Sequence, residues 1–351
     1  MGNLLNYSAI AAKVRAMRSR LFSAEDFRKL AMQESVPAAV EVLRGYPAYE
    51  KIFEGAESGN LHREQIEQLL WLSLYRDFSG LYRFASVRQR KFLDLYFMHF
   101  EVELLKHCLR NVASGRSSPP DVHLYENFFR RHSRLDFISL AECTSIGDFV
   151  ERLSGSVYAK PMQELTAAGG IALADYVSAL DTLYFTEVWK HVIKHLGREE
   201  QEAVMECIGE KIDLLNLEWI ARAKQYYQLN GRAIRELLIP VYYRLRKKQV
   251  HDLSEAESFD SFLDSLRTTR YGDRVFGKEG EKQETTGLKQ LFRSLLNTVY
   301  ESSRKKNPYS AAILNSYLYF KEEEIRKLIT IIEGIRYSLD REEILACLGE
   351  C

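Results

Sequence analysis

The 351-residue sequence contains few residues that would interrupt helices or cross-link the chain. It has 7 prolines and 5 cysteines, and its 49 basic and 49 acidic residues leave no net charge. Scarce proline leaves long helices possible, and zero net charge excludes a global field that attracts nucleic acid or anionic lipid, although a local patch remains possible. The odd cysteine number, without a Cys-x-x-Cys pair, argues against a disulfide framework or structural zinc and favours a reducing compartment.

Sequences that direct a chain into or onto a membrane are also missing. No apolar run approaches the ~18 residues that span a bilayer. The opening MGNLLNYSAI lacks the basic region and apolar core of a secretion signal. Position 6 is Asn6, where N-myristoylation requires serine or threonine. We therefore expect a cytosolic protein that reaches a membrane only by docking on an embedded partner.

What the sequence does contain is a segment that occurs three times. Residues 30–43 align without a gap to residues 140–153 and 253–266, and each copy opens and closes with leucine. The serines five residues into the copies are Ser35, Ser145 and Ser258. Apolar residues then recur with the i, i+3, i+4, i+7 spacing of one helix face, and a serine before them can accept hydrogen bonds from first-turn amides. We expect each serine to begin a helix.

A second marker repeats in phase with the first. In each copy an acid is followed four residues later by leucine and, three residues after that, by another apolar residue. The acids are Glu101, Asp213 and Glu324, and the leucines are Leu105, Leu217 and Leu328. The leucines lie 112 and 111 residues apart and the serines 110 and 113. This period exceeds that of common helical solenoids; it predicts three similar units, with the three leucines buried at equivalent positions.

Breaks between the copies suggest units of residues 1–115, 116–230 and 231–351. Two prolines interrupt the chain within residues 113–120. We interpret Asn230 and Gly231 as the C-terminal stop of the second marker helix.

Within the third unit, residues 272–287 carry many charges and no periodicity, and we predict a mobile loop there. The sequence Asn307-Pro308-Tyr309-Ser310 opens the last long helix. No segment has a convincing strand or hairpin pattern. We predict an all-α fold of three similar helical bundles.

Candidate chemical sites are few. His191 and His195 share one helix face, as in half of a zinc site, but Val192 stands where a metalloprotease has glutamate and no third ligand is recognisable. A solvated helix face is the favoured interpretation. His251-Asp252 resembles a paired metal ligand, but its place just before the repeated Leu253 favours a loop entering a helix.

Other charged runs also point away from catalysis. We interpret Glu322-Glu323-Glu324 as ordinary first-turn or surface charges. No glycine-rich phosphate loop occurs, so we expect no nucleotide binding. We expect no catalytic, cofactor-binding or metal-binding residue, and the residues that contact partners stay unassigned.

Three basic runs could bind nucleic acid where aromatic residues lie beside them. The runs are Arg130-Arg131-His132-Ser133-Arg134, Arg244-Leu245-Arg246-Lys247-Lys248 and Arg304-Lys305-Lys306, and the neighbouring aromatics are Phe128, Phe129, Tyr242 and Tyr243. Zero net charge and neighbouring acidic runs, such as residues 255–264, favour solvated faces or a protein-docking rim instead.

Together these markers resemble the C-subunit family of archaeal and bacterial A/V-type ATPases, the counterpart of the eukaryotic d subunit. The similar segments are residues 7–18, 100–110, 213–222 and 307–337, in the family's order and spacing. The chain departs from the family where asparagine is expected three residues after each marker acid: only Asn216 keeps it, against Leu104 and Lys327. Val241-Tyr242-Tyr243 also replace expected glycines.

The resemblance implies a funnel of three helical bundles around a pseudo-three-fold axis. It implies a non-catalytic rotor subunit on the cytoplasmic face of the membrane, acting as a socket between the central stalk subunits of D and F type and the proteolipid ring. It implies torque transmission for ATP-coupled ion transport, no cofactor, no nucleic acid, and membrane association through the ring only. The alternatives are a helical scaffold unrelated to ATPases and a metal-dependent enzyme that uses His191 and His195.

Overall fold

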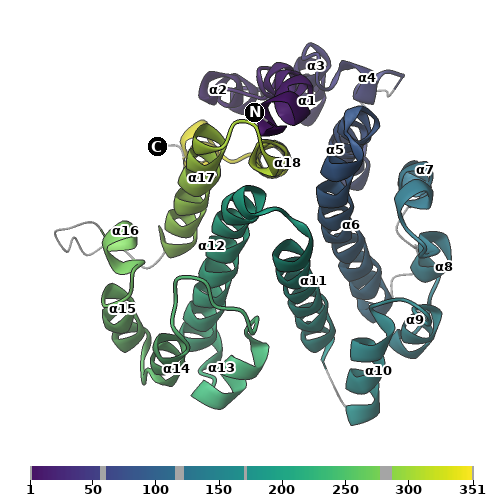
Figure 1. The fold of residues 1–351 in the computed structure, drawn as a ribbon. Helices are drawn as coiled ribbons and strands as arrows, with labels where there is room; N and C mark the ends of the chain where they lie inside the picture. The colour runs from purple at the N-terminus through teal and green to yellow at the C-terminus, as the bar shows by residue number, and fades with distance from the viewer. Residues whose placement is uncertain (1, 56–60, 115–121, 170–171, 277–286, 350–351) are drawn as a thin grey trace. The chain divides into compact units, whose positions relative to one another are not determined.

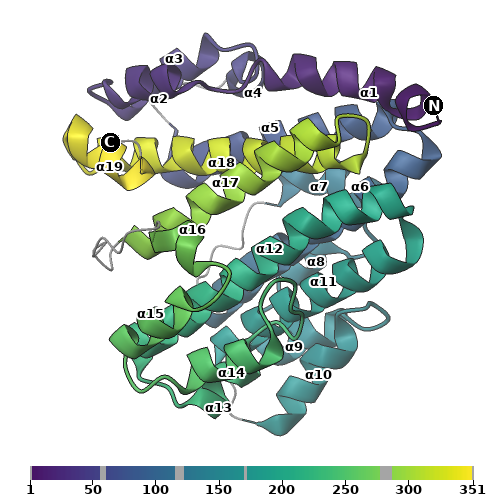
Figure 2. The ribbon, with the colours of Figure 1, turned by 60° about the vertical axis from the view of Figure 1, so that its left-hand side comes forward.

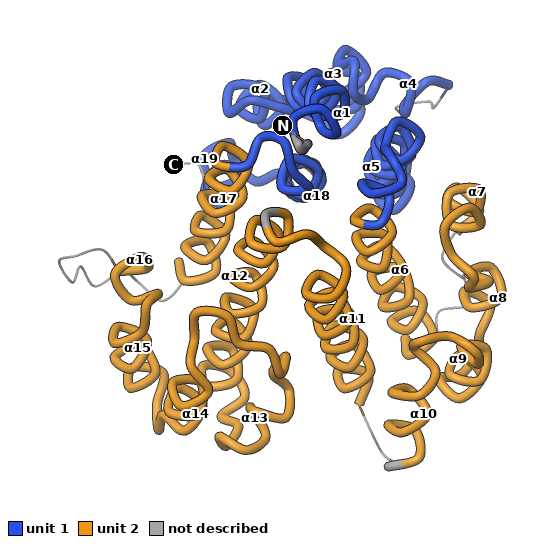
Figure 3. Tube along the Cα trace, in the orientation of Figure 1, with its two compact units in different colours: residues 1–91, 307–351 blue, residues 92–306 orange. Residues whose placement is uncertain are grey.

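The computed structural model describes residues 2–55, 61–114, 122–169, 172–276 and 287–349 (Figure 1). Every regular element in these ranges is a helix, which confirms the all-α prediction. The chain forms two compact units (Figure 3): unit 1 contains residues 1–91 and 307–351, and unit 2 contains residues 92–306. Unit 1 therefore combines both ends of the chain. The three-unit division at 115 and 230 and the three-fold arrangement stay predictions.

Unit 1 is organised around one long helix from the C-terminal part of the chain. Its helices are α1 (Gly2–Arg18), α2 (Ala24–Ala31), α3 (Val36–Arg44), α4 (Glu50–Phe53), α5 (Arg63–Phe84), the start of α6 (Val87–Ser114), α18 (Ala311–Arg336) and α19 (Arg341–Leu348). Helix α18 packs against α1, α2, α3, α5 and α19. Ser310 caps its first turn by accepting a hydrogen bond from the amide of Ala312, as the sequence predicts for this helix start.

Unit 2 contains several long helices, of which α11, α12 and α17 pack side by side, and a number of short ones. Its helices are the rest of α6, α7 (His123–His132), α8 (Phe137–Ala141), α9 (Ile146–Arg152), α10 (Ala159–Ala168), α11 (Leu173–His195), α12 (Arg198–Arg222), α13 (Gly231–Leu237), α14 (Lys247–Glu255), α15 (Phe259–Arg267), α16 (Gly272–Phe276) and α17 (Leu288–Lys306). Helix α12 packs on both α11 and α17, and Figure 2 shows it between them.

The three repeated serines all begin helices, as predicted. The Ser35 hydroxyl accepts a hydrogen bond from the amide of Ala38 at 3.3 Å. Ser145 does the same for Asp148 at 3.1 Å before α9, and Ser258 for Ser261 at 3.1 Å before α15. Each serine satisfies an amide that has no partner inside the helix. The repeated sequence thus specifies the same local structure three times.

The three marker leucines are all buried, as predicted. Leu105 in α6, Leu217 in α12 and Leu328 in α18 each expose 0% of their surface. Leu217 belongs to a core cluster that also contains Leu253, Phe262 and Leu266 from the third copy of the serine segment. The marker helix of the second copy therefore packs against the serine segment of the third.

The predicted C-terminal stop of the second marker helix at Asn230 and Gly231 is wrong. Asn230 does not stop the second marker helix; its side chain caps the start of α13 by accepting the Ala233 amide at 2.9 Å. Helix α12 continues instead through a π-helical turn, Ala223–Tyr227, and ends at Gln228, whose φ is 48°. A residue in this left-handed region closes a helix without glycine, at some conformational cost.

The predicted loop at residues 272–287 is wrong for its first five residues. They form α16, in which Gly272, Val275 and Phe276 are buried, because two apolar side chains suffice to anchor one turn against the core. Residues 277–286 lie outside the described ranges. Among the helices that the structure describes, none combines the length and apolarity needed to cross a bilayer.

Candidate functional site

The marker acids are the most unusual polar groups in the structure, because each is withdrawn from solvent and accepts a hydrogen bond from a tyrosine. Glu101 accepts from the Tyr158 hydroxyl at 2.9 Å and also from Ser133. Asp213 accepts from the Tyr271 hydroxyl at 3.0 Å. Glu324 accepts from the Tyr49 hydroxyl at 2.6 Å. A carboxylate removed from water must gain such partners, so these contacts hold the helices in register.

Each tyrosine comes from the predicted unit that follows the unit of its acid, with the first unit following the third. The acid of the first predicted unit binds Tyr158 of the second unit, and the acid of the second unit binds Tyr271 of the third. The acid of the third unit binds Tyr49 of the first. The pairing is therefore cyclic, and every pair joins segments on opposite sides of a predicted boundary. The sequence contains a signal for these tyrosines: they follow the closing leucine of each serine segment by six, five and five residues.

Glu324 lies in a buried ionic cluster that sequence reasoning missed. Besides Tyr49, its carboxylate accepts the Phe22 amide at 2.5 Å and the Lys321 ammonium at 2.7 Å. Lys321 is 1% exposed; it also donates to the Tyr49 oxygen at 2.8 Å and lies 4.1 Å from that ring's centroid. The cluster ties the N-terminal segment of unit 1 to the C-terminal helix α18.

The prediction that residues 322–324 are first-turn or surface charges is wrong. Glu322, Glu323 and Glu324 are 1%, 7% and 4% exposed and lie near the middle of α18. Arg326 pairs with both Glu322 and Glu323. A helix surrounded on several sides by other helices has no solvent face in this region, and local sequence does not reveal that enclosure.

Asp213 uses its carboxylate to fix an irregular loop. It accepts the backbone amides of Tyr243 at 3.1 Å, Arg244 at 2.6 Å and Leu245 at 3.0 Å. Three consecutive amides converging on one carboxylate form an anion-binding nest that is filled by the protein itself. The loop between α13 and α14 is thereby fastened to α12.

Near this loop, the one asparagine that follows the family pattern and one departure from that pattern both have local explanations. Asn216, on α12, binds the backbone of the loop at Ile239 through two hydrogen bonds. Its side-chain nitrogen donates to the Ile239 carbonyl at 3.0 Å, and its side-chain oxygen accepts from the Ile239 backbone N–H at 2.9 Å. Tyr243, which replaces an expected glycine, packs its ring over Gly209 of α12, where an added Cβ would come within 2.4 Å of it. A glycine on the helix therefore admits the larger loop residue.

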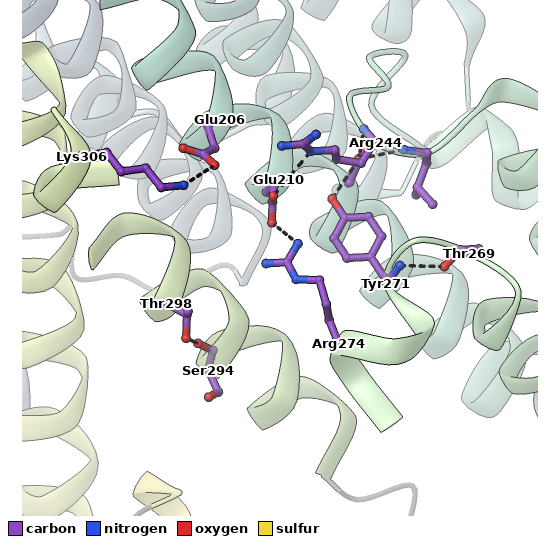
Figure 4. A network of polar contacts seen from close by, with 11 residues as sticks. Glu206, Glu210, Arg244, Thr269, Tyr271, Arg274, Ser294, Thr298 and Lys306 are labelled. Carbon is purple, nitrogen blue, oxygen red and sulfur yellow. Dashed lines mark hydrogen bonds and ion pairs between the residues drawn. The ribbon is translucent and has the colours of Figure 1, made fainter. Parts of the chain in front are cut away.

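Glu210 is a second buried acid on α12, one turn before Asp213. Figure 4 shows Arg244 and Arg274 approaching it from different segments. Its carboxylate lies 2.6 Å from Arg274 and 3.7 Å from Arg244, and its side chain is 4% exposed. Two cations around one buried acid fasten α16 and the α13–α14 loop to the same helix.

The paired tyrosines give the protein a predictable response to alkaline pH. Burial, followed by the adjacent carboxylate, raises the pKa of Tyr49, Tyr158 and Tyr271 above the ordinary value. In the unfolded chain these tyrosines have a pKa of about 10. Below that pH the neutral, hydrogen-bonded tyrosine contributes its full stabilisation to the fold. As the pH rises from about 10 towards the higher pKa of the folded state, this stabilisation is progressively lost. Above about pH 10 we expect the free energy of unfolding to fall by up to about 1.4 kcal/mol per pH unit for each tyrosine.

Urea unfolding at a series of pH values checks this expectation, with tyrosine ionisation followed by ultraviolet absorbance. Tyr158→Phe should make the free energy of unfolding fall less steeply with pH above about pH 10, by the contribution of one tyrosine. The pH dependence near neutral pH should be unchanged. Ionisation of all tyrosines in the folded protein at the ordinary pKa would contradict the buried pairing.

The histidine candidates do not form a metal centre with the described residues. The His191 and His195 rings are 4.2 Å apart on α11, and burial, followed by the charge of His195, lowers the pKa of His191. Across the described ranges, no group of three or more histidine, cysteine, aspartate or glutamate side chains could hold a metal ion. His251 and Asp252 lie inside α14, not in a loop before it, and both are largely exposed.

Of the aromatic residues beside the basic runs, Phe128 and Phe129 are buried core residues, and Tyr242 and Tyr243 are partly buried. Phe128 and Phe129 pack with Phe97, at centroid distances of 5.5 and 5.6 Å. Tyr243 packs against Gly209 and Trp189. Several cations of the runs pair with acids: Arg130 with Glu126, Arg304 and Lys305 with Glu301, and Lys306 with Glu206. None of the four rings is fully exposed, which disfavours base stacking at these positions.

The cysteines that the structure describes are free thiols. Cys108, Cys143 and Cys207 are buried and Cys347 is exposed. Burial raises the pKa of Cys108 and of Cys207 to about 12. Thiols with such pKa values are protonated at neutral pH and are poor nucleophiles.

The buried polar groups of this protein are thus arranged to fasten helices to one another. The marker acids are saturated by hydrogen bonds from within the protein, and their carboxylates face tyrosine, backbone and lysine donors.

Comparison with known proteins gives, over nearly the whole chain, the same family that the sequence resembles. The C subunit of the A-type ATP synthase of Thermococcus kodakarensis is 27% identical over 347 residues, covering 98% of this chain and 90% of that protein. The proteins of the same name from Methanosphaera stadtmanae and Haloquadratum walsbyi are 26% and 25% identical, covering 95% and 97% of this chain and 84% and 97% of their own lengths. The family model of the ATP synthase (C/AC39) subunit matches residues 10–347. The chain therefore belongs to the C/AC39 subunit family of the ATP synthases.

Proposed function

We propose that this chain is the non-catalytic rotor subunit that links the central stalk of an A/V-type ATPase to the membrane proteolipid ring. The observation that carries the proposal is the family match over residues 10–347. In this role the subunit sits on the cytoplasmic face of the membrane, receives the D- and F-type stalk subunits on one side and docks on the ring on the other. It transmits torque and binds neither nucleotide nor nucleic acid.

The polar contacts inside each unit support a mechanical role. In unit 1, Glu324 joins the N-terminal segment to α18, and in unit 2 Asp213 and Glu210 join α12 to three later segments. Hydrogen bonds have directional geometry and resist sliding of one helix past another, whereas apolar contacts alone permit it more easily. A subunit that transmits torque needs this resistance.

The test is the coupling of ATP hydrolysis to ion pumping. Membrane vesicles that carry the ATPase without this subunit should hydrolyse ATP at the catalytic head and should not take up ions. Adding the purified protein back should restore uptake. Undiminished pumping in its absence would end the proposal, and loss of hydrolysis by the isolated head would assign a catalytic part to this chain.

If exposed charged residues help the subunit to dock on the stalk and the ring, its attachment should depend on ionic strength, because such charges are screened within about 3 Å at 1 M salt. We expect high salt to release the subunit from the complex before it unfolds. Retention of the subunit at salt concentrations that remove other peripheral subunits would contradict electrostatic docking.

A further inference from the structure

Two segments of unit 1 contain basic residues and no acidic ones. Residues 1–24 carry Lys13, Arg15, Arg18 and Arg20, and residues 78–91 carry Arg83, Arg88, Arg90 and Lys91; neither segment has an aspartate or glutamate. In a chain with equal numbers of acids and bases, two acid-free stretches concentrate positive charge. The first contains α1, and the second forms the elbow between α5 and α6.

The fold places these two segments together. The side-chain amide of Gln89, at the start of α6, donates to the backbone carbonyl of Asn6 in α1 at 2.8 Å. Two turns further along α1, the Lys13 ammonium lies over the Phe84 ring, 5.5 Å from its centroid. One face of α1 therefore lies along the elbow, and Lys13 adds its charge to the cations there, whereas Arg15 and Arg18 lie over the rings of Tyr309 and Phe320.

The same region exposes large apolar side chains. Leu5 and Val87 are each 76% exposed, Phe84 is 52% exposed and Leu4 is 49% exposed. Leu4 and Leu5 come from the N-terminal turns of α1, and Phe84 and Val87 lie on the two sides of the elbow. We call these four residues with Lys13, Arg83 and Lys91 the α1–elbow surface.

The cations of this surface are available for an external partner. Arg83 and Lys91 are exposed. Within the described ranges, Lys13, Arg83 and Lys91 form no ion pair, and Lys13, which is half-buried, makes a cation–π interaction with the Phe84 ring. This contrasts with the basic runs of unit 2, where Arg130, Arg304 and Lys306 pair with acids.

We propose that the α1–elbow surface binds directly to an anionic phospholipid surface. Separate apolar side chains framed by lysine and arginine suit the boundary between headgroups and acyl chains, because the apolar groups enter the boundary while the cations reach the phosphates. A protein partner would require a matching set of pockets for four protruding side chains. This lipid contact would add to the attachment through the proteolipid ring, which the family resemblance implied as the only link to the membrane.

The experiment is flotation of the purified full-length protein with lipid vesicles. Vesicles of phosphatidylcholine alone are compared with vesicles that also contain phosphatidylglycerol. We expect the protein to float with the anionic vesicles and not with the neutral ones, and to be released at high salt. Because the vesicles contain no other ATPase component, the result is independent of the proposed function.

Variants locate the contact. Arg83→Gln with Lys91→Gln should weaken binding about 25-fold, since each cation near an anionic surface contributes about fivefold. Leu5→Ser with Phe84→Ser should weaken it about tenfold or more. The matched controls are Lys247→Gln with Lys248→Gln, two exposed cations on α14, and Val157→Ser, an apolar residue that is 62% exposed. Both controls should bind nearly as well as the unchanged protein, and thermal unfolding should show that all variants are folded.

Three results would overturn the proposal. The first is equal flotation with neutral and anionic vesicles. The second is a loss of binding in the α14 control as large as in the Arg83 and Lys91 variant, which would indicate attraction without a defined surface. The third is absence of vesicle binding together with weaker assembly of the surface variants into the ATPase, which would assign the surface to a protein partner.

Discussion

Replacing Glu324 with methionine is expected to lower the free energy of unfolding by about 3–5 kcal/mol, the usual cost of removing one member of a buried ion pair. The substitution leaves the Lys321 ammonium 1% exposed without its carboxylate. It also leaves the Phe22 amide and the Tyr49 hydroxyl without their acceptor. Chemical denaturation of the full chain, followed by circular dichroism, measures the loss.

A second variant separates the charge from the packing. Replacing both Lys321 and Glu324 with methionine removes the unpaired charge, so most of the lost stability should return. Glu25→Ala, which breaks an exposed pair with Lys29, is the control and should unfold like the unchanged protein. If the Glu324 variant also unfolds like the unchanged protein, the cluster does not hold the two ends of the chain together.

Truncating a marker leucine to alanine is expected to cost about 2–5 kcal/mol, the range for a fully packed leucine. Leu105, Leu217 and Leu328 are all completely buried, so each substitution leaves a cavity that its neighbours fill only in part. Similar losses at the three positions are expected if the repeats share one packing arrangement. Thermal and urea unfolding of the three single variants measure this directly.

Leu5→Ala is the matched control, because this leucine is 76% exposed and its truncation removes little buried surface. Losses below about 1 kcal/mol at all three marker positions would mean that the marker helices pack loosely. A large loss at one position and small losses at the others would show that the repeats have diverged in how they pack.

The sequence predicted what depends on local chemistry. A serine before an amphipathic segment begins a helix through its own hydroxyl, so Ser35, Ser145 and Ser258 could be identified without knowledge of the fold. The burial of Leu105, Leu217 and Leu328 follows from repeated spacing on one helix face. The family could be recognised because several such segments occur in order across the chain.

The sequence could not predict contacts made between distant segments. Glu324 looks like a surface charge beside two other glutamates, and its burial depends on Phe22 and Tyr49, which lie 302 and 275 residues away. An asparagine can either end one helix or cap the start of the next. At Asn230 the choice follows from the π-helical turn before it, which already ends the preceding helix at Gln228. The short α16 is stabilised by the core rather than by its own sequence.

The pairing between the two ends of the chain has a consequence for synthesis. Residues 92–306 can form unit 2 as soon as they leave the ribosome, because its internal pairs lie within that stretch. The first 91 residues emerge earlier but wait for α18, which is made almost last. Until then Tyr49 lacks Glu324 and Lys321, and the faces of α2 and α3 that pack on α18 are uncovered; incompletely folded units with uncovered apolar surface are vulnerable to aggregation. The part of the protein that is translated first is therefore the part that finishes folding last.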